Sequence, residues 1–263
     1  MQDRVKVSIA QGIADVRLNR PDKMNALDSA MFEALVETGR GLGSERGLRA
    51  VVLSGEGRAF CAGLDVASFM GGGGARSLLE RNAGSPANFA QSAAWVWSEL
   101  PVPVIAAIHG VAFGGGLQIA LATDIRFVAP DARLSVMEIK WGLIPDMSAS
   151  QTLRRLVRLD VAKELTFTGR IVSGNQAAEL GLATHVSDTP REAALELALE
   201  IASKSPTAIR AGKQLLDASG DLDVAAGLLL EERLQKTLLG TPNQIESVRA
   251  NVEKRDARFE DPD

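Results

Sequence analysis

The sequence predicts an α/β fold built on a largely parallel sheet and followed by a helical region. Short apolar runs alternate with helical patterns: a strand over 103–109, a glycine turn, a helix over 117–123 and a strand over 124–129. Strands that alternate with helices through short connections are typical of a parallel sheet covered by helices. After about Gly169 the strand patterns fade, and the rest of the chain shows mainly helical patterns.

The stretch between Glu99 and Asp124 carries no charged residue and is long enough to cross a bilayer. Pro101, Pro103 and four glycines interrupt it, however. A buried strand, a glycine turn and a buried helix explain the same apolar residues better than a membrane span does.

Two strands and a helix open the chain. Apolar and polar residues alternate over 4–10 and again over 13–18, with a Gln-Gly turn between them, which predicts a β-hairpin. Asp28 is a plausible cap for a helix over 29–42, and an apolar strand follows over 48–55.

A glycine-rich segment over 70–88 comes before a helix over 89–100. Its glycines oppose a fixed conformation, so we interpret it either as a segment that orders around a ligand or as a plain linker. Four helical patterns with Ser, Thr or Asp near their starts are expected in the C-terminal part, over 173–181, 190–204, 205–219 and 223–240.

Length and composition fit one soluble domain with a smaller helical appendage. The 263 residues are 46% hydrophobic with a formal net charge of −4, which offers little to attract nucleic acid. One cysteine and two histidines, Cys61, His109 and His185, argue against a disulfide or a metal site. We expect Cys61 to be a buried filler and His109 a hydrogen-bonded core residue. The start of the chain lacks the apolar core of a signal peptide, so we expect a cytoplasmic location.

Two glycine-containing loops are the candidate site for chemistry. In "VAFGGGLQ" (111–118) the glycines lie at a strand-to-helix junction, where unpaired N–H groups and the positive end of the helix dipole converge. In "FCAGLD" (60–65), Gly63 allows a turn that points the N–H of Leu64 outward. Two such donors aimed at one oxygen would form an oxyanion hole. The alternative is that the glycines only allow tight packing of helix on sheet.

These two loops also resemble a known family. "GRAFCAGLD" (57–65) followed by "IHGVAFGGGLQIALATDIR" (108–126) is similar to the paired signature of the crotonase superfamily, the enoyl-CoA hydratase and isomerase group. "NRPDKMNAL", "MEIKWGLIPD" and "KRDARFEDPD" resemble the family's early loop, its catalytic segment and its usual ending. The resemblance therefore covers nearly the whole chain.

The resemblance implies a crotonase-like fold, with a spiral of ββα units over residues 1–195 and a C-terminal helical trimerisation region over 196–263. It implies a homotrimer or a dimer of trimers that binds acyl-CoA thioesters and stabilises the enolate formed at the thioester carbonyl. Coenzyme A would be part of the substrate, and no separate cofactor, nucleic acid or membrane is expected.

The positions that match the family's two main-chain oxyanion-hole donors are Leu64 and Gly115, so the resemblance implies that these two residues supply the N–H groups. The family's CoA-binding segments match "KMNAL" and "CAGLD", in which the expected contact residues are Lys23, Met24, Ala26, Leu27, Ala62, Gly63 and Asp65. Arg255 or Arg258 would join Lys23 near the CoA phosphates.

The acid and base residues decide the reaction. Hydratases of the family use two glutamates, and the matching positions here hold Gln118 and Glu138. An amide can orient water but cannot exchange a proton at neutral pH. Asp146 follows eight residues after Glu138, and dienoyl-CoA isomerases resemble this carboxylate pair, although they carry aspartate where Gln118 stands. We therefore expect a double-bond isomerase, with a one-glutamate hydratase and a non-catalytic acyl-CoA binding protein as alternatives.

Both carboxylates also have purely structural interpretations. Glu138 could pair with Arg133 or Lys140 as an ordinary ion pair. Asp146 could cap a helix that begins directly after it.

Overall fold

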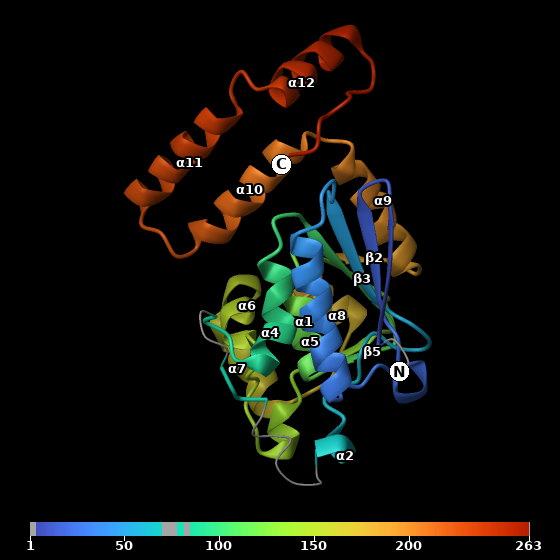
Figure 1. Ribbon diagram of the computed structural model, residues 1–263. Helices are drawn as coiled ribbons and strands as arrows, with labels where there is room; N and C mark the ends of the chain where they lie inside the picture. The colour runs from blue at the N-terminus through green and yellow to red at the C-terminus, as the bar shows by residue number, and fades with distance from the viewer. Residues whose placement is uncertain (1–3, 70–77, 82–84, 263) are drawn as a thin grey trace.

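The computed structural model describes residues 4–69, 78–81 and 85–262 of the chain. Within these residues the strands form two sheets (Figure 1). The larger runs in the order β1 (Val5–Ala10), β2 (Ile13–Leu18), β3 (Ala50–Gly55), β4 (Val104–Ile108), β6 (Ile125–Val128) and β9 (His185–Val186). The smaller runs in the order β5 (Val111–Phe113), β7 (Arg133–Ser135) and β8 (Val172–Ser173).

The larger sheet confirms the predicted hairpin and the largely parallel arrangement. β1 pairs with β2 antiparallel, from Val5 opposite Leu18 to Ala10 opposite Ile13, and each later pair in this sheet is parallel. All of β4 is buried, and so are residues 50–54 of β3. These strands are continuous apolar runs because both of their faces are covered.

The chain winds as a spiral that adds a strand to each sheet and then a helix. β4 leads to β5 and α5 (Gly115–Leu121), and β6 leads to β7 and then to α6 (Ala149–Leu156). A parallel bridge between Cys61 and Ala112 brings the loop after β3 beside β5. These are the ββα units that the resemblance implied. The smaller sheet leaves no strand pattern in the sequence because its strands are only two or three residues long.

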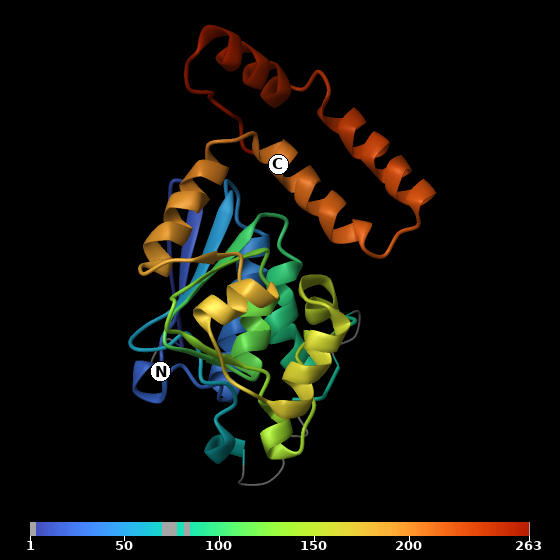
Figure 2. The ribbon, with the colours of Figure 1, turned by 180° about the vertical axis from the view of Figure 1, so that it is seen from behind.

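Helices cover both faces of the larger sheet (Figures 1 and 2). α1 (Ser29–Gly43) and α4 (Phe89–Ser98) share the main apolar core with α5 and one face of the strands. α9 (Pro190–Ala202) places its buried alanines against the other face. α1 begins as predicted, because the Asp28 carboxylate accepts the N–H of Met31 at 2.9 Å.

The last three helices form what we call the helical arm: α10 (Pro206–Ser219), α11 (Val224–Leu238) and α12 (Pro242–Glu253). The arm extends away from the sheets (Figures 1 and 2). Leu230 is the one buried residue of α11. The first two arm helices match predicted patterns, whereas α12 was missing from the prediction.

The boundary predicted between residues 195 and 196 falls inside α9, which packs on the sheet, so the arm leaves the core only after that helix. The remaining short elements are η1 (Pro21–Lys23), α2 (Val66–Phe69), η2 (Glu138–Trp141), α7 (Leu159–Thr168) and α8 (Gly174–Leu180). Much of the glycine-rich segment predicted over 70–88 lies outside the described residues. In the part of the chain that is described, no helix is long and apolar enough to span a bilayer.

Candidate active site

The loop that carries Leu64 lies directly against the loop that carries Gly115. Gly63 has a φ of +86°, and a Cβ added to it would stand 2.6 Å from the carbonyl oxygen of Phe113 and 3.7 Å from the nitrogen of Gly115. A side chain cannot fit there, so the backbone needs glycine for the close approach and for the conformation. The two candidate donors predicted from separate parts of the chain are therefore neighbours.

The pairing of Leu64 with Leu27 leaves the N–H of Leu64 free. The N–H of Leu27 donates to the Gly63 carbonyl at 2.8 Å, and the N–H of Asp65 donates to the Leu27 carbonyl at 2.9 Å. This parallel bridge uses the groups on either side of the Leu64 N–H, which faces away from Leu27. Among the described residues nothing accepts that N–H.

The glycine turn before α5 presents the second donor. Gly114 adopts φ 51° and ψ −122°, and its N–H donates to the Ser135 carbonyl at 2.9 Å. Gly115 is the first residue of α5, so its N–H has no partner within the helix. A Cβ on Gly116 would stand 2.5 Å from the Cys61 carbonyl oxygen. Gly116 therefore permits close packing, and the N–H of Gly115 has no partner within the helix, as an oxyanion-hole donor would require.

Glu138 lies beside this turn at the start of η2. Its Oε1 accepts a hydrogen bond from Gln118 Nε2 at 2.6 Å and lies 3.2 Å from where a Cβ on Gly114 would stand. Its Oε2 is buried, and no partner is found for it in the described part of the chain. A buried carboxylate oxygen without a donor is costly in a purely structural role. This oxygen is the strongest candidate for a group that meets a ligand.

Both predicted carboxylates have raised pKa values, and the charge of Asp146 acts on Glu138. Burial raises the pKa of Glu138 above its usual range, and the negative charge of Asp146 raises it further. Asp146 is open to solvent on one side, while burial on the other side raises the pKa of its carboxyl as well. Raised carboxyl pKa values bring an acid and a base closer to neutral pH, where proton transfer is efficient.

The structural alternatives for these carboxylates are not observed. The guanidinium of Arg133 lies over the Phe113 ring, and the ammonium of Lys140 lies over the Trp141 ring. Neither of these cations forms an ion pair with Glu138 in the described part of the chain.

Asp146 does not cap the helix that follows it. The residue at the N-cap of α6 is Ser148, with a φ of 76° and no side-chain hydrogen bond to the helix. The side-chain oxygen of Gln118, Oε1, instead accepts the N–H groups of Met147 at 2.8 Å and Ala149 at 3.2 Å. The Asp146 carboxylate is therefore available for another role.

Gln118 is almost completely buried, with 1% of its surface exposed. In the hydratase alternative Gln118 would orient a water molecule, whereas in the structure its oxygen accepts from two main-chain donors and its nitrogen donates to Glu138. Its observed contacts are with the protein itself.

The expected CoA-binding segment is held in an uncommon backbone conformation. Met24 and Asn25 both have positive φ, 49° and 55°. Lys23 is exposed, and Met24 and Ala26 are half-buried. Leu27 is fully buried with both main-chain groups paired, and its predicted contact with CoA stays a prediction.

The second expected segment is anchored through its acidic residue. Ala62 is half-buried, and the Asp65 carboxylate accepts a hydrogen bond from Arg20 Nη1 at 2.8 Å. The same guanidinium nitrogen donates to the Ala26 carbonyl at 3.0 Å, so Arg20 joins the two expected CoA segments. The arginine holds the pKa of Asp65 low against the effect of burial.

Asn25 was missed in the sequence as a residue that shapes the site. It is fully buried, and its Nδ2 donates to the carbonyls of Ala59 at 2.8 Å and Phe60 at 3.1 Å. The polar residue inside "KMNAL" was the available signal, because a buried amide must find partners on neighbouring segments.

Cys61 and His109 keep structural roles. Cys61 is buried, its thiol donates to the Asn25 carbonyl at 3.1 Å, and burial raises its pKa to about 12. It is a poor nucleophile, as expected. His109 follows β4 and is half-buried, not a core residue, and its Nε2 lies 3.0 Å from the Gly57 carbonyl oxygen.

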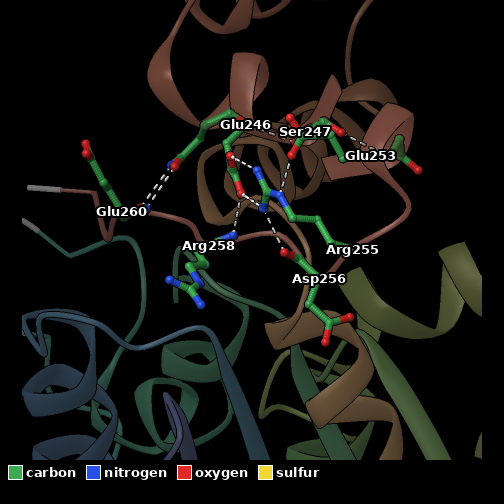
Figure 3. A network of polar contacts seen from close by, with 9 residues as sticks. Glu246, Ser247, Glu253, Arg255, Asp256, Arg258 and Glu260 are labelled. Carbon is green, nitrogen blue, oxygen red and sulfur yellow. Dashed lines mark hydrogen bonds and ion pairs between the residues drawn. The ribbon is translucent and has the colours of Figure 1, made fainter. Parts of the chain in front are cut away.

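The C-terminal arginines lie in a network on the arm (Figure 3). Glu246 accepts two hydrogen bonds from the Arg255 guanidinium, at 2.6 and 2.9 Å, and one from the N–H of Arg258 at 2.8 Å. Arg255 lowers the pKa of Glu246 to about 2. This engagement does not support the predicted role of Arg255 near CoA phosphates. The Arg258 guanidinium points away from the network in Figure 3.

Comparison with known proteins places the chain in a family. The sequence profile described as "Enoyl-CoA hydratase/isomerase" matches residues 8–262. The chain belongs to the enoyl-CoA hydratase/isomerase family. Among the described residues, no group of three or more His, Cys, Asp or Glu side chains could hold a metal ion.

Relatives within the enoyl-CoA hydratase/isomerase family carry both reaction names. The chain is 35% identical to mouse (Mus musculus) "Enoyl-CoA hydratase domain-containing protein 2, mitochondrial", over 95% of this chain and 84% of the relative. It is 34% identical to mouse "Delta(3,5)-Delta(2,4)-dienoyl-CoA isomerase, mitochondrial", over 97% of this chain and 81% of the relative. The crystal structure of enoyl-CoA hydratase from Bacillus anthracis matches with a TM-score of 0.91 and 32% identity, over 97% of this chain and 98% of that one. The predicted crotonase fold is thereby confirmed.

Proposed function

We propose that this member of the enoyl-CoA hydratase/isomerase family is an isomerase that shifts a carbon-carbon double bond in an enoyl- or dienoyl-CoA. The thioester oxygen would lie between the N–H groups of Leu64 and Gly115. Glu138 and Asp146 would move the proton. Coenzyme A is part of the substrate in this proposal, and no separate cofactor is needed.

The observation that carries the proposal is the environment of the carboxylates. Burial raises the pKa values of both carboxyl groups, the charge of Asp146 raises that of Glu138 further, and Glu138 Oε2 has no partner among the described residues. The third polar group, Gln118, is an amide and cannot exchange a proton at neutral pH. This set supports a reaction that needs one base and one acid more than one that needs two glutamates around a water.

The proposed isomerisation moves one proton off the acyl chain and returns one to it. One ionised carboxylate takes a proton from a carbon of the acyl chain, and the C–H electron pair enters the conjugated system as far as the thioester oxygen. The two N–H donors stabilise that oxyanion, and losing one such donor costs about 2.7–4 kcal/mol of transition-state stabilisation. The carbonyl then re-forms, and the other carboxyl group gives its proton to a carbon further along the chain. After the step the base carries one proton more and the acid one proton fewer, so the starting state returns when a proton passes from the base to the acid by way of solvent, to which Asp146 is open.

Substrate binding and assembly belong to the same proposal. CoA would lie along Lys23, Met24 and Ala26 on one segment and Ala62 and Asp65 on the other. Homotrimers or dimers of trimers would form through the arm, which supports this with exposed apolar side chains, Val224 at 81%, Leu228 at 59% and Leu229 at 65% exposed. A cytoplasmic location stays a prediction, since relatives with mitochondrial in their names are among the matches.

A hydratase is the second candidate because relatives named hydratase match this chain as well as the isomerase does. In that reaction Glu138 Oε2 would hold and deprotonate the water without a second glutamate. The unpartnered oxygen is compatible with this role.

Incubation with 2-enoyl-, 3-enoyl- and 3,5-dienoyl-CoA in heavy water separates the candidates. The proposal expects rearranged double bonds, with deuterium incorporated at the carbon that receives the proton. Formation of 3-hydroxyacyl-CoA as the main product would favour the hydratase. Thioesters that bind but stay unchanged would contradict both and favour an acyl-CoA binding protein.

A further inference from the structure

We infer that Gln118 is a positioning residue that fixes the two carboxylates, Glu138 and Asp146, relative to each other through a single buried amide. The inference rests on the proposed function and adds to it a role for Gln118 other than the orientation of water. We call the set of three hydrogen bonds made by the Gln118 side chain the amide clamp.

The amide clamp has one possible orientation. Gln118 Oε1 accepts the N–H groups of Met147 and Ala149, at 2.8 and 3.2 Å, while Nε2 donates to Glu138 Oε1 at 2.6 Å. Rotating the amide by 180° would set its NH₂ group against two main-chain donors and its oxygen against a carboxylate. Both rotated contacts are repulsive, so the chemistry of the partners fixes which atom meets Glu138.

The donor half of the clamp selects the free oxygen of Glu138. Because Oε1 is held by Gln118, Oε2 is the oxygen left without a partner in the described part of the chain. A hydrogen bond to the ionised form also opposes the effect of burial on the carboxyl. Gln118 therefore fixes which oxygen of Glu138 is free and partly opposes the rise in pKa that burial causes.

The acceptor half of the clamp fixes the turn that carries Asp146. Met147 is the next residue along the chain, and its N–H is the closer of the two donors to Gln118 Oε1. Ser148 does not cap α6 with its own side chain, so Gln118 supplies the acceptor that the start of this helix needs. One side chain in α5 thus holds both segments that bear carboxylates.

Hydrogen-bonding capacity argues against water orientation. Gln118 Oε1 already accepts two hydrogen bonds, which fills its two lone pairs. The side chain is 1% exposed. A water bound to the amide could accept only from the one N–H of Nε2 that does not donate to Glu138. The amide oxygen could not help to orient that water.

The test combines isomerase kinetics with ¹³C NMR titration of the labelled glutamate carboxyls, in which Glu138→Gln assigns the Glu138 signal. Gln118→Leu removes both halves of the clamp. We expect kcat to fall about 10²-fold, since a displacement of about 1 Å costs that much, with a much smaller change in KM. The Glu138 titration should move to higher pH because its donor is lost. Gln151→Leu, which changes an exposed glutamine at the start of α6, is the matched control and should alter neither readout.

Gln118→Glu keeps the acceptor half and replaces the donor half, so it tests the inference even where Gln118→Leu does not fold. We expect the Glu138 titration to move to higher pH, because a like charge or a shared proton replaces the donated hydrogen bond. A gain in hydration with an unchanged Glu138 titration would overturn the inference and favour water orientation. Wild-type kcat and titration in both Gln118 variants would overturn it as well. If the wild-type protein turns over none of the thioesters, the proposed function fails, and the NMR titration still decides the clamp.

Discussion

The two ends of α5 differ in how their polar groups are used. At the first residue, Gly115, the N–H has no acceptor in the described part of the chain, and Glu138 lies beside the turn with one oxygen unpartnered. At the other end the carbonyls are satisfied: Thr123 Oγ1 donates to the Ala120 carbonyl at 2.8 Å, and Ser98 Oγ donates to the Ala122 carbonyl at 2.7 Å. The same seven-residue helix is left open at one end and closed at the other.

The two ends of α5 also differ in whether the nearby carboxylates are paired with a cation. Beyond the closed end, Asp124 accepts from the Val104 N–H at 2.7 Å and from Lys213 of α10, a lysine with only 7% of its side chain exposed. At the open end no cation is paired with Glu138 among the described residues. At the closed end the polar groups are paired and support the fold, whereas the unpartnered oxygen of Glu138 at the open end is the one to which we assign proton transfer. Substitutions at the two ends should therefore affect different measurements.

Glu138→Gln should cause the largest loss of activity. The amide keeps the shape and can still accept from Gln118, but it cannot take a proton, and general acid-base catalysis contributes about 10²- to 10⁴-fold. We expect kcat to fall within that range, with thioester binding retained by calorimetry. Activity within a few-fold of wild type would show that another group is the base.

Gly63→Ala should cause the next largest loss by disturbing the oxyanion hole. The new Cβ would stand 2.6 Å from the Phe113 carbonyl oxygen at a φ of +86°, so the loop that holds the Leu64 N–H must move. Loss of one such donor lowers kcat by about 10²- to 10³-fold. Gly41→Ala is the control, since a Cβ there meets nothing within 4 Å and should leave activity unchanged. Equal effects of the two alanines would remove the special role of the loop.

Lys213→Met should reduce stability at the closed end and leave kcat nearly unchanged. It leaves the half-buried carboxylate of Asp124 without its cation. Breaking a fully buried pair in this way costs about 3–5 kcal/mol, so we expect a loss toward the lower end of that range. Denaturant unfolding measures the loss. Lys236→Met, which removes an exposed ion pair with Glu232 on the arm, should cost about 0–1 kcal/mol. A large fall in kcat for folded Lys213→Met would contradict the division between the two ends.

The smallest expected effect is a pH-dependent change in the melting temperature of Glu138→Gln. Burial raises the folded-state pKa of Glu138 above its ordinary value of 4.5, so ionised Glu138 destabilises the fold at neutral pH. Below pH 4.5 the carboxyl is protonated in the folded and unfolded states alike, and the penalty disappears. Glu138→Gln should therefore melt at a higher temperature than wild type near neutral pH, with the difference shrinking as the pH falls through this window. A difference that grows toward acid would mean that the folded pKa is lowered.

The sequence predicts the core better than it predicts the site. Apolar runs such as 104–108 and the Asp28 cap have local causes, so the strands, the hairpin and the first helix were predictable. The smaller sheet and the contact between Gly63 and Gly115 depend on segments about fifty residues apart, which no local pattern reports. The family resemblance supplied that contact.

The contacts of polar side chains were the hardest to predict. Nothing local to Gln118 indicates that its oxygen accepts from Met147 and Ala149, about thirty residues later. From the sequence, Asp146 could be either the N-cap of a helix or a proton-transferring residue. The position of Ser148 at the N-cap of α6 excludes the first of these roles. Spacing identifies which residue types are present, whereas their partners depend on the folded loops.

The most direct test is a crystal structure with a bound saturated acyl-CoA, which has the thioester but no double bond to move. The account predicts the thioester oxygen within about 3.1 Å of both the Leu64 and Gly115 nitrogens, with the Glu138 carboxylate facing the acyl carbons. A thioester oxygen that contacts neither N–H group, or a ligand bound elsewhere on the protein, would contradict it.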